Sequence, residues 1–254
     1  MLYYLLCRAI GTVEESSRGR LFDVMASGLS HKADNVLFSV TDSEASWHTD
    51  GTSRDNVFDV VGLLCIRPAK EGGSFALSNA CNAFSSLESR MPRFIMYELL
   101  RHLPREVMEK GQGKGNIPED FISTVSRGDK LLGLRTLRNS YPIYEVLALD
   151  IHSDLMIDRR MRFRYMRFWI ESGHKKAGLK VPPLTRIAMD FLDKELDRWC
   201  CFKERLEAGT IVFSNNNLIS HARDAFKDST TGKPRHMVRA WIQTQVTDMQ
   251  DDRM

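Results

Sequence analysis

Two histidines and an aspartate in this chain have the types and spacing of a metal-ligand set. His48 and Asp50 are separated by one residue, and alternation along an extended segment directs such side chains to the same side. A third ligand has to come from elsewhere, and His221, in the loop expected after the strand TIVFSNN, is the strongest candidate. Two imidazoles and one carboxylate on one face of iron(II) leave three positions open, enough for a bidentate 2-oxo acid and dioxygen.

A histidine and an aspartate one residue apart occur often by chance, so the surrounding segments decide what the pair means. Four separated segments, SWHTDG, DVVGLLCIRPAKEGGSF, RYMRFWIESGHKKAG and AGTIVFSNNNLISHARDAF with PRHMVRAWI, follow one another. Their order resembles the taurine dioxygenase and clavaminate synthase-like family of 2-oxoglutarate oxygenases, over roughly Val40 to Thr244. The resemblance implies a jelly-roll fold, an iron(II) held by His48, Asp50 and His221, and 2-oxoglutarate and dioxygen as co-substrates.

Three arginines near the end of the chain extend this resemblance. In the family, an arginine a little over a dozen residues after the second metal-binding histidine holds the distal carboxylate of 2-oxoglutarate, and Arg235 matches that position. A guanidinium suits the task because its planar fork meets a carboxylate bidentately. Arg239, on the same side of a strand, is expected to contact the co-substrate or an acidic group of the substrate, with an internal Asp or Glu as the alternative partner. Arg223, in HARDAF, is expected to contact substrate or to brace the metal loop.

One position departs from the family pattern. Relatives tend to carry Thr or Ser two places after the Gly72-Gly73 pair, where the hydroxyl contacts 2-oxoglutarate, and this chain has Phe75 there. Ser74 is the expected substitute for that hydroxyl, with Ser78 as an alternative. Relatives are also expected to have a further strand and helix before the segment that matches Leu2 to Gly11.

The elements that must position these residues are mostly strands. Apolar, β-branched runs bounded by turn residues predict strands or extended segments, while apolar residues at helical spacing predict three helical segments. Scattered strands with few helices favour a mainly β fold, a double-stranded β-helix (jelly-roll) core decorated by helices. The expected strands are 35–40, 59–69, 74–80, 141–152, 161–170, 205–216 and 235–246, and the expected helices are 2–10, 83–103 with a break at Pro92, and 184–199.

The helix expected over 184–199 has the clearest pattern in the chain. We expect one of its faces to be apolar and buried, with charged residues on the other. That face consists of Leu184, Ile187, Ala188, Phe191, Leu192, Leu196 and Trp199.

Length and composition fit one globular domain over 1–254. Hydrophobic residues make up 43% of the chain and charged residues 27%, which is ordinary for a folded domain. Residues 109–139 are rich in Gly, Lys and Arg with weak periodicity, so we expect a long excursion there that could act as a lid.

Charge and cysteine content exclude several classes of protein. The net charge is +3 with acids and bases mixed along the chain, which gives no support for nucleic-acid binding. Five cysteines form an odd set without CxxC spacing, so we expect a reducing, cytoplasmic location. No stretch approaches the ~20 apolar residues that span a bilayer, and no membrane partner is expected. The oligomeric state stays open.

These observations predict a dioxygenase that hydroxylates an unactivated C–H bond of a small, acidic or amino-acid-like metabolite, as in natural-product biosynthesis, and releases succinate and CO2. Halogenation is disfavoured because Asp50 fills the coordination position that a halide would need. Two alternatives remain: a catalytically silent jelly-roll module, favoured by Phe75, and a metal enzyme of the same barrel that does not use 2-oxoglutarate. A hydrolase has little support, since no nucleophile elbow is present.

Overall fold

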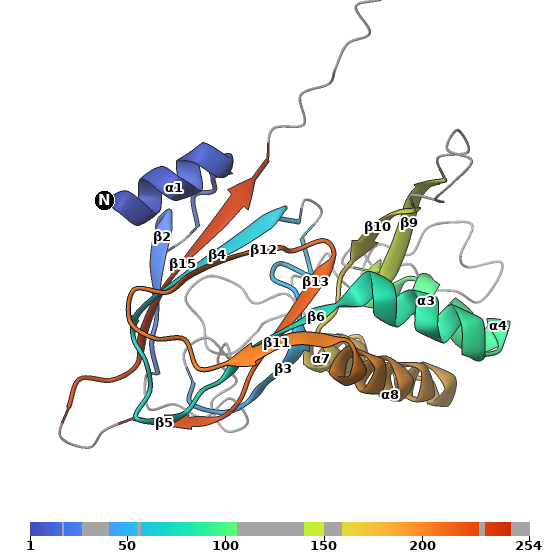
Figure 1. Ribbon diagram of the computed structural model, residues 1–254. Helices are drawn as coiled ribbons and strands as arrows, with labels where there is room; N and C mark the ends of the chain where they lie inside the picture. Colours follow the sequence, from blue (N-terminus) through green and yellow to red (C-terminus); the bar gives the residue numbers. More distant parts are fainter. Residues whose placement is uncertain are drawn as a thin grey trace, which may run out of the picture.

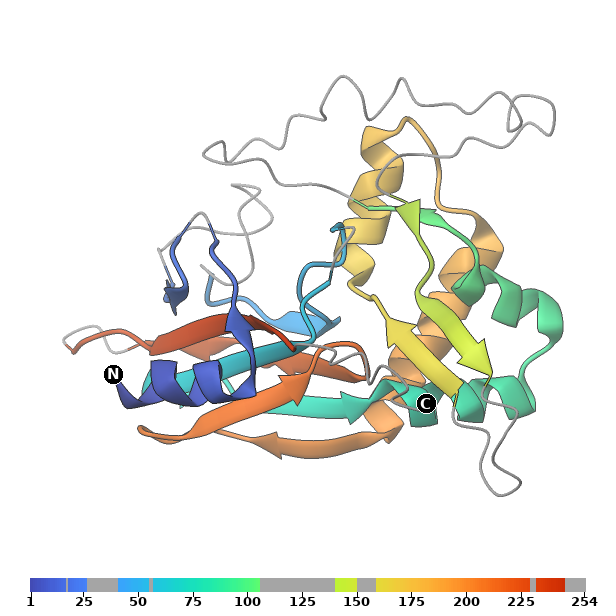
Figure 2. The same ribbon diagram turned by 90° about the horizontal axis from the view of Figure 1, so that it is seen from above.

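The computed structural model describes residues 1–16, 18–26, 41–54, 57–105, 140–149, 159–228 and 232–244. Two antiparallel sheets form the core of the fold, and most helices lie beyond one end of these sheets (Figure 1). The view from above in Figure 2 shows the same division, with helix α1 alone on the opposite side.

The first sheet contains the two longest strands, which lie next to each other. Strand β15 (His236–Gln243) pairs with β4 (Val60–Arg67), with β1 (Thr12–Val13) and with β2 (Leu21–Val24). On its other edge β4 pairs with β12 (Ile211–Asn215). Both ladders of β4 run without a break through Val61, which lies opposite Ser214 of β12 and Trp241 of β15. Alternation therefore places these three side chains in one layer.

The second sheet brings together segments that are far apart in the sequence. Its order is β11 (Cys200–Glu204), β6 (Phe75–Asn79), β13 (Ile219–Arg223) and β3 (Ala45–His48). All three pairings are antiparallel. Together the two sheets form the predicted jelly-roll core.

Short strand pairs complete the β structure. Strand β5 (Glu71–Gly72) pairs with β14 (Phe226–Lys227), β7 (Leu103–Pro104) with β8 (Ser140–Tyr141), and β9 (Tyr144–Leu149) with β10 (Arg159–Phe163). Gly72 and Gly73 have φ values of 70° and 73°, in the left-handed region that favours glycine, so the pair makes the tight turn into β6.

Five helices are described. They are α1 (Leu2–Ile10), α3 (Ala80–Arg90), α4 (Arg93–Leu100), α7 (Arg167–Lys176) and α8 (Pro183–Arg198). The predicted break at Pro92 is confirmed, because Pro92 is the N-cap of α4. Helices α3, α4, α7 and α8 share one hydrophobic core, which includes Leu87, Leu99, Ile170, Leu192 and Leu196.

Two details of the predicted elements are wrong. The run 161–170 is not extended throughout, because a helix begins at Arg167 after strand β10 has ended at Phe163. The exposed i,i+4 pair of Arg167 and Glu171 and the burial of Ile170 both favour that helix.

The buried face of α8 is also rotated from the predicted one. Leu184 and Ile187 are each 41% exposed, while Thr185 and Met189 are fully buried. Thr185 is held inside because its hydroxyl donates to the Glu98 carboxylate of α4. Ala188, Leu192 and Leu196 are buried as expected.

Two predictions concern residues outside the described ranges. They are the strand at 35–40 and the lid at 109–139. Within the described part of the chain, no helix is long and apolar enough to cross a membrane.

Candidate metal centre

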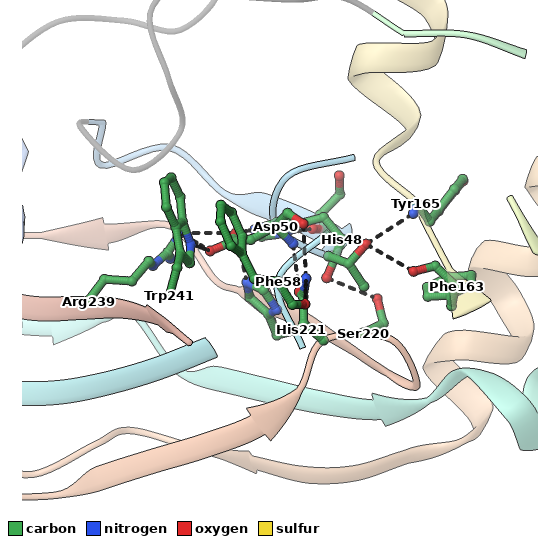
Figure 3. Close-up of polar contacts among 12 residues, drawn as sticks. His48, Asp50, Phe58, Phe163, Tyr165, Ser220, His221, Arg239 and Trp241 are labelled. Atoms are coloured by element: carbon green, nitrogen blue, oxygen red, sulfur yellow. Dashed lines mark hydrogen bonds and ion pairs between the residues drawn. The ribbon is translucent and has the colours of Figure 1, made fainter. Parts of the chain in front are cut away.

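His48, Asp50 and His221, the metal ligands expected from the sequence, lie together in the structure (Figure 3). Strands β3 and β13 pair directly, with His221 opposite His48, and the two imidazole centroids are 4.1 Å apart. Oδ1 of Asp50 is 3.6 Å from Nε2 of His221 and 4.0 Å from Nε2 of His48. The potential ligand atoms of the three residues all lie within 4.8 Å of one another, and all three residues are buried.

The two histidines are on strands, and not in the loops that were expected. His48 is the last residue of β3, and His221 is the third residue of the five-residue strand β13. Only Asp50 lies in a turn, directly after β3. The pairing of β3 with β13 creates the site, because neighbouring side chains across a ladder lie close together.

His48 has a fixed ring orientation. Its Nδ1 lies 2.7 Å from the carbonyl oxygen of Ser46, so Nδ1 carries the proton and donates it to that oxygen. Burial, followed by the charge of His221, lowers the pKa of His48 to about 3. His48 is therefore neutral at ordinary pH, and its Nε2 lone pair faces Asp50 and His221. This is the usual state of a metal-binding histidine.

His221 supplies the clearest sign of a metal ion. Both of its ring nitrogens are buried, and neither has a hydrogen-bond partner among the described residues. Burying a polar atom without a partner costs about 1–3 kcal/mol. A cation between Nε2 of His221, Nε2 of His48 and Oδ1 of Asp50 would satisfy one of these nitrogens. Two imidazoles and a carboxylate are the ligand set that iron(II) oxygenases use, so the residues fit that metal.

The carboxylate of Asp50 is held by two donors from β15. Nη1 of Arg239 lies 3.1 Å from Oδ1 and 2.8 Å from Oδ2, and Nε1 of Trp241 donates to Oδ2 at 2.7 Å. Burial alone would raise the pKa of Asp50, but Arg239 and the two imidazoles hold it well below its usual range. Oδ2 accepts from both donors, whereas Oδ1 accepts only the longer contact from Nη1 and faces the two histidines.

Asn216 fixes the turn that carries Asp50. Its Oδ1 accepts the backbone N–H of Asp50 at 2.8 Å, and its Nδ2 donates to the carbonyl oxygens of Asp50 and Phe58, each at 3.0 Å. The sequence pattern singles out neither Asn216 nor Trp241 as a residue of the site. One signal was available for Trp241, because alternation puts it on the same side of β15 as Arg239.

Arg235 and Arg223 lie on the ring of Phe226. Their guanidinium carbons are 5.1 and 4.8 Å from its centroid. Burial lowers the pKa of Arg235 to about 10 and that of Arg223 to about 9, with further lowering from the neighbouring arginines. Among the described residues no carboxylate forms an ion pair with Arg235. Arg223 donates to the carbonyl of Ser43, in the segment that leads into β3, which is a bracing contact.

A small pocket lies inside the barrel next to the metal site. Ser78 cannot serve as the replacement hydroxyl in this pocket, because it donates to the carbonyl of Leu196 at 2.6 Å. Ser74 does not line the pocket, whereas Phe75 forms part of its wall. The lining residues are Val61, Leu63, Phe75, Val212, Ser214, His221 and Arg239.

The other described histidines have hydrogen bonds away from the cluster of His48, Asp50 and His221. His102 contacts the carbonyl of Ser140, His174 the carbonyl of Ile170, and His236 the carboxylate of Asp23.

Solved structures share this fold. Asparagine oxygenase in complex with Fe(II), 2S,3S-3-hydroxyasparagine and succinate aligns with 96% of this chain and 64% of its own, with a TM-score of 0.64 and 14% identity. The non-haem iron oxygenase OrfP in complex with Fe, succinate and (3S)-hydroxy-L-Arg aligns with 95% of this chain and 66% of its own, with a TM-score of 0.60 and 16% identity. At these identities the likeness concerns the fold alone.

Two characterised proteins are similar in sequence. FR-33289 synthase from Streptomyces rubellomurinus is 25% identical over 206 residues, which cover 80% of this chain and 50% of that protein. Gamma-butyrobetaine dioxygenase from a Pseudomonas species is 24% identical over 237 residues, 93% of this chain and 52% of that protein. The chain thus spans about half the length of these relatives.

The family predicted from the sequence is confirmed by a family-wide comparison. The model of the family described as "Taurine catabolism dioxygenase TauD, TfdA family" matches residues 5–241, nearly the whole chain. The chain therefore belongs to the TauD/TfdA dioxygenase family.

Proposed function

We propose that this protein is an iron(II)- and 2-oxoglutarate-dependent dioxygenase that hydroxylates a C–H bond of a small, acidic or amino-acid-like metabolite, with release of succinate and CO2. The observation that carries the proposal is the buried cluster of His48, Asp50 and His221, in which both nitrogens of His221 lack a protein partner among the described residues. Membership of the TauD/TfdA family supports the same chemistry.

The protein's own contribution is a rigid set of ligands on one side of the metal. Bound iron(II) supplies the activation of dioxygen, which no side chain can perform. His48 Nε2, Asp50 Oδ1 and His221 Nε2 would hold the metal, and the remaining coordination positions would stay available to small molecules. Asn216 keeps the Asp50 turn in place, while Arg239 and Trp241 hold the second carboxylate oxygen.

Arg235 is the residue proposed to bind the distal carboxylate of 2-oxoglutarate. Its guanidinium is buried on the ring of Phe226, and no carboxylate among the described residues forms an ion pair with it. A buried cation of this kind is stabilised by an anionic ligand. The apolar walls of the pocket, Val61, Leu63, Phe75 and Val212, would exclude water from the bound co-substrate.

The proposed substrate class rests on the arginines near the site and on the ligands that similar solved structures hold. Nη1 of Arg239 is paired with Asp50, as the internal-acid alternative expects, while Nε of this pocket-lining side chain has no partner among the described residues. Other cations near the site are also proposed to receive an acidic substrate group. Arg18 and Arg54 are available. The guanidinium of Arg18 lies 4.3 Å from the Phe22 centroid, and that of Arg54 lies 5.4 Å from the Trp241 centroid. The asparagine oxygenase and OrfP structures named above hold hydroxylated amino acids.

The proposal is tested by assaying succinate. Protein loaded anaerobically with Fe(II) is mixed with 2-oxoglutarate, air and a panel of amino acids and other small acids, with metal-free protein as the control. We expect succinate to form only with iron present, and the stimulating compound to gain one oxygen atom. Protein that binds iron but never consumes 2-oxoglutarate would contradict the proposal and favour a silent module or a different metal enzyme.

A further inference from the structure

Ser214 places a hydroxyl in the pocket beside the metal site. The residue is 7% exposed and lines this pocket together with His221 and Arg239. Its hydroxyl has no hydrogen bond to any described residue, unlike the buried Ser78, which donates to a main-chain carbonyl. The hydroxyl oxygen is not one of the fully buried atoms that lack a partner, so it keeps access to the pocket and can donate to a ligand there.

The strand register places Ser214 at the metal end of the pocket. Ser214 lies opposite Val61, and Val61 lies opposite Trp241, whose indole donates to the metal-binding residue Asp50. Arg235 is at the other end, because it precedes the first residue of β15, His236, which pairs with the last residue of β4. A ligand that extends from the metal to Arg235 would therefore meet Ser214 close to the metal.

No other pocket-lining residue offers a hydroxyl. The position where relatives tend to have Thr or Ser is Phe75, whose ring is 6.0 Å from the ring of His221 and forms an apolar wall. The remaining lining residues are three aliphatic side chains, His221, and Arg239, whose Nη1 is engaged by Asp50. Ser214 thus carries the one hydroxyl among the described lining residues, beside Nε of Arg239, which also has no partner among the described residues.

We infer that Ser214 Oγ donates a hydrogen bond to the metal-bound carboxylate of a 2-oxo acid co-substrate, at the end of the molecule opposite to Arg235. This inference rests on the proposed function and adds a contact to it. Phe75 occupies the position where relatives tend to have a hydroxyl. Ser214 supplies a hydroxyl from the facing sheet in its place, at the metal end of the co-substrate. A hydroxyl donating to a carboxylate forms a charge-assisted bond, stronger than one between neutral groups.

Direct binding measurements on the iron(II)-loaded protein without oxygen test this role. The visible charge-transfer absorption of the iron(II)–2-oxo acid complex reports binding of 2-oxoglutarate and of pyruvate, which lacks the distal carboxylate. We expect Ser214→Ala to weaken both ligands about 10-fold, the loss typical of one charge-assisted hydrogen bond. Ser214→Thr keeps a hydroxyl and should bind both ligands much more tightly than Ser214→Ala.

Ser89→Ala is the matched control, because it removes a serine hydroxyl at an exposed position of α3, where it donates to the carbonyl of Ser86, and Ser89 does not line the pocket. It should change both affinities by less than about twofold. Wild-type affinities in Ser214→Ala would overturn the inference, and so would a loss confined to 2-oxoglutarate, because that would place Ser214 at the distal end. Failure of the wild-type protein to bind 2-oxoglutarate would instead contradict the proposed function itself.

Discussion

Arg239 and Asp50 form a bifurcated contact inside the barrel, in which one nitrogen of the arginine, Nη1, lies 3.1 and 2.8 Å from the two carboxylate oxygens. Both side chains are almost completely buried. The pair matters for function because Asp50 is also the proposed carboxylate ligand of the metal. Arg239 therefore supports the metal site from the side opposite to the histidines, and the contact that it makes in this structure is internal.

Removing the second donor to Asp50 should weaken metal binding. In Trp241→Phe the ring is kept, but the 2.7 Å hydrogen bond to Oδ2 is lost. Loss of such an outer partner lowers metal affinity about 10- to 100-fold, which isothermal titration with Fe(II) without oxygen would measure. Trp47→Phe is the control, because Trp47 donates a bond of equal length to Asp197, away from the metal residues. Equal affinities in both variants would contradict a positioning role for Trp241.

Replacing any of the three proposed ligands should abolish metal binding without unfolding the protein. His221→Ala is the most informative, because it also removes two buried nitrogens that have no partner among the described residues. Its metal-free form should therefore unfold near the wild-type temperature, which circular dichroism would record. The variants His48→Ala and Asp50→Ala should likewise lose iron binding. Retained iron binding in one variant would remove that residue from the site.

Replacing Arg235 should affect the co-substrate and not the metal. Arg235→Ala removes a bidentate, charge-assisted contact worth roughly 2–4 kcal/mol, so the apparent KM for 2-oxoglutarate should rise about 30- to 1000-fold. Arg235→Lys keeps the charge without the planar fork and should give an intermediate value. The affinity for Fe(II), titrated without 2-oxoglutarate, should stay unchanged in both. An unchanged KM would transfer the role to another arginine, such as Arg223.

The Asp50 turn should depend on Asn216 for stability. Asn216→Ala leaves three buried main-chain groups without their partner, so urea denaturation should show a loss of about 2–4 kcal/mol in the free energy of unfolding. Asn217→Ala, which removes one side-chain bond to Asp59, should lose about 1 kcal/mol. The Asn216 variant should also bind iron more weakly. Similar losses in the two variants would show that the turn is held by other contacts.

Compounds with an acidic group should stimulate 2-oxoglutarate consumption more than neutral or cationic ones. The expected cations are Arg18 and Arg54, so Arg54→Gln should raise the half-saturating concentration of the stimulating acid about 3- to 10-fold. Arg198→Gln, on the last turn of α8, is the control for the loss of one exposed arginine. Equal stimulation by neutral compounds, or a wild-type response from Arg54→Gln, would defeat the acidic-substrate proposal.

The sequence alone was sufficient to name the three residues of the cluster, the family and the jelly-roll core. Residue type and short spacing carry this information, because the identity of a metal ligand and the alternation of a strand depend on adjacent residues. For the same reason α1 and α8 were predicted within about a residue of their observed ends.

The tertiary structure decided which residues meet. His221 reaches His48 only because β13 pairs with β3 in one register, and that pairing depends on closure of the whole barrel. Arg239 could have faced a substrate acid, and the register of β15 instead brings it and Trp241 to Asp50. In α8 the buried hydrogen bond from the Thr185 hydroxyl to the Glu98 carboxylate helps to determine which face of the helix packs against the core. These contacts depend on the register between segments that are distant in sequence. A shift of one residue would turn every side chain of a strand to the other face of the sheet, so local sequence patterns do not determine the contacts.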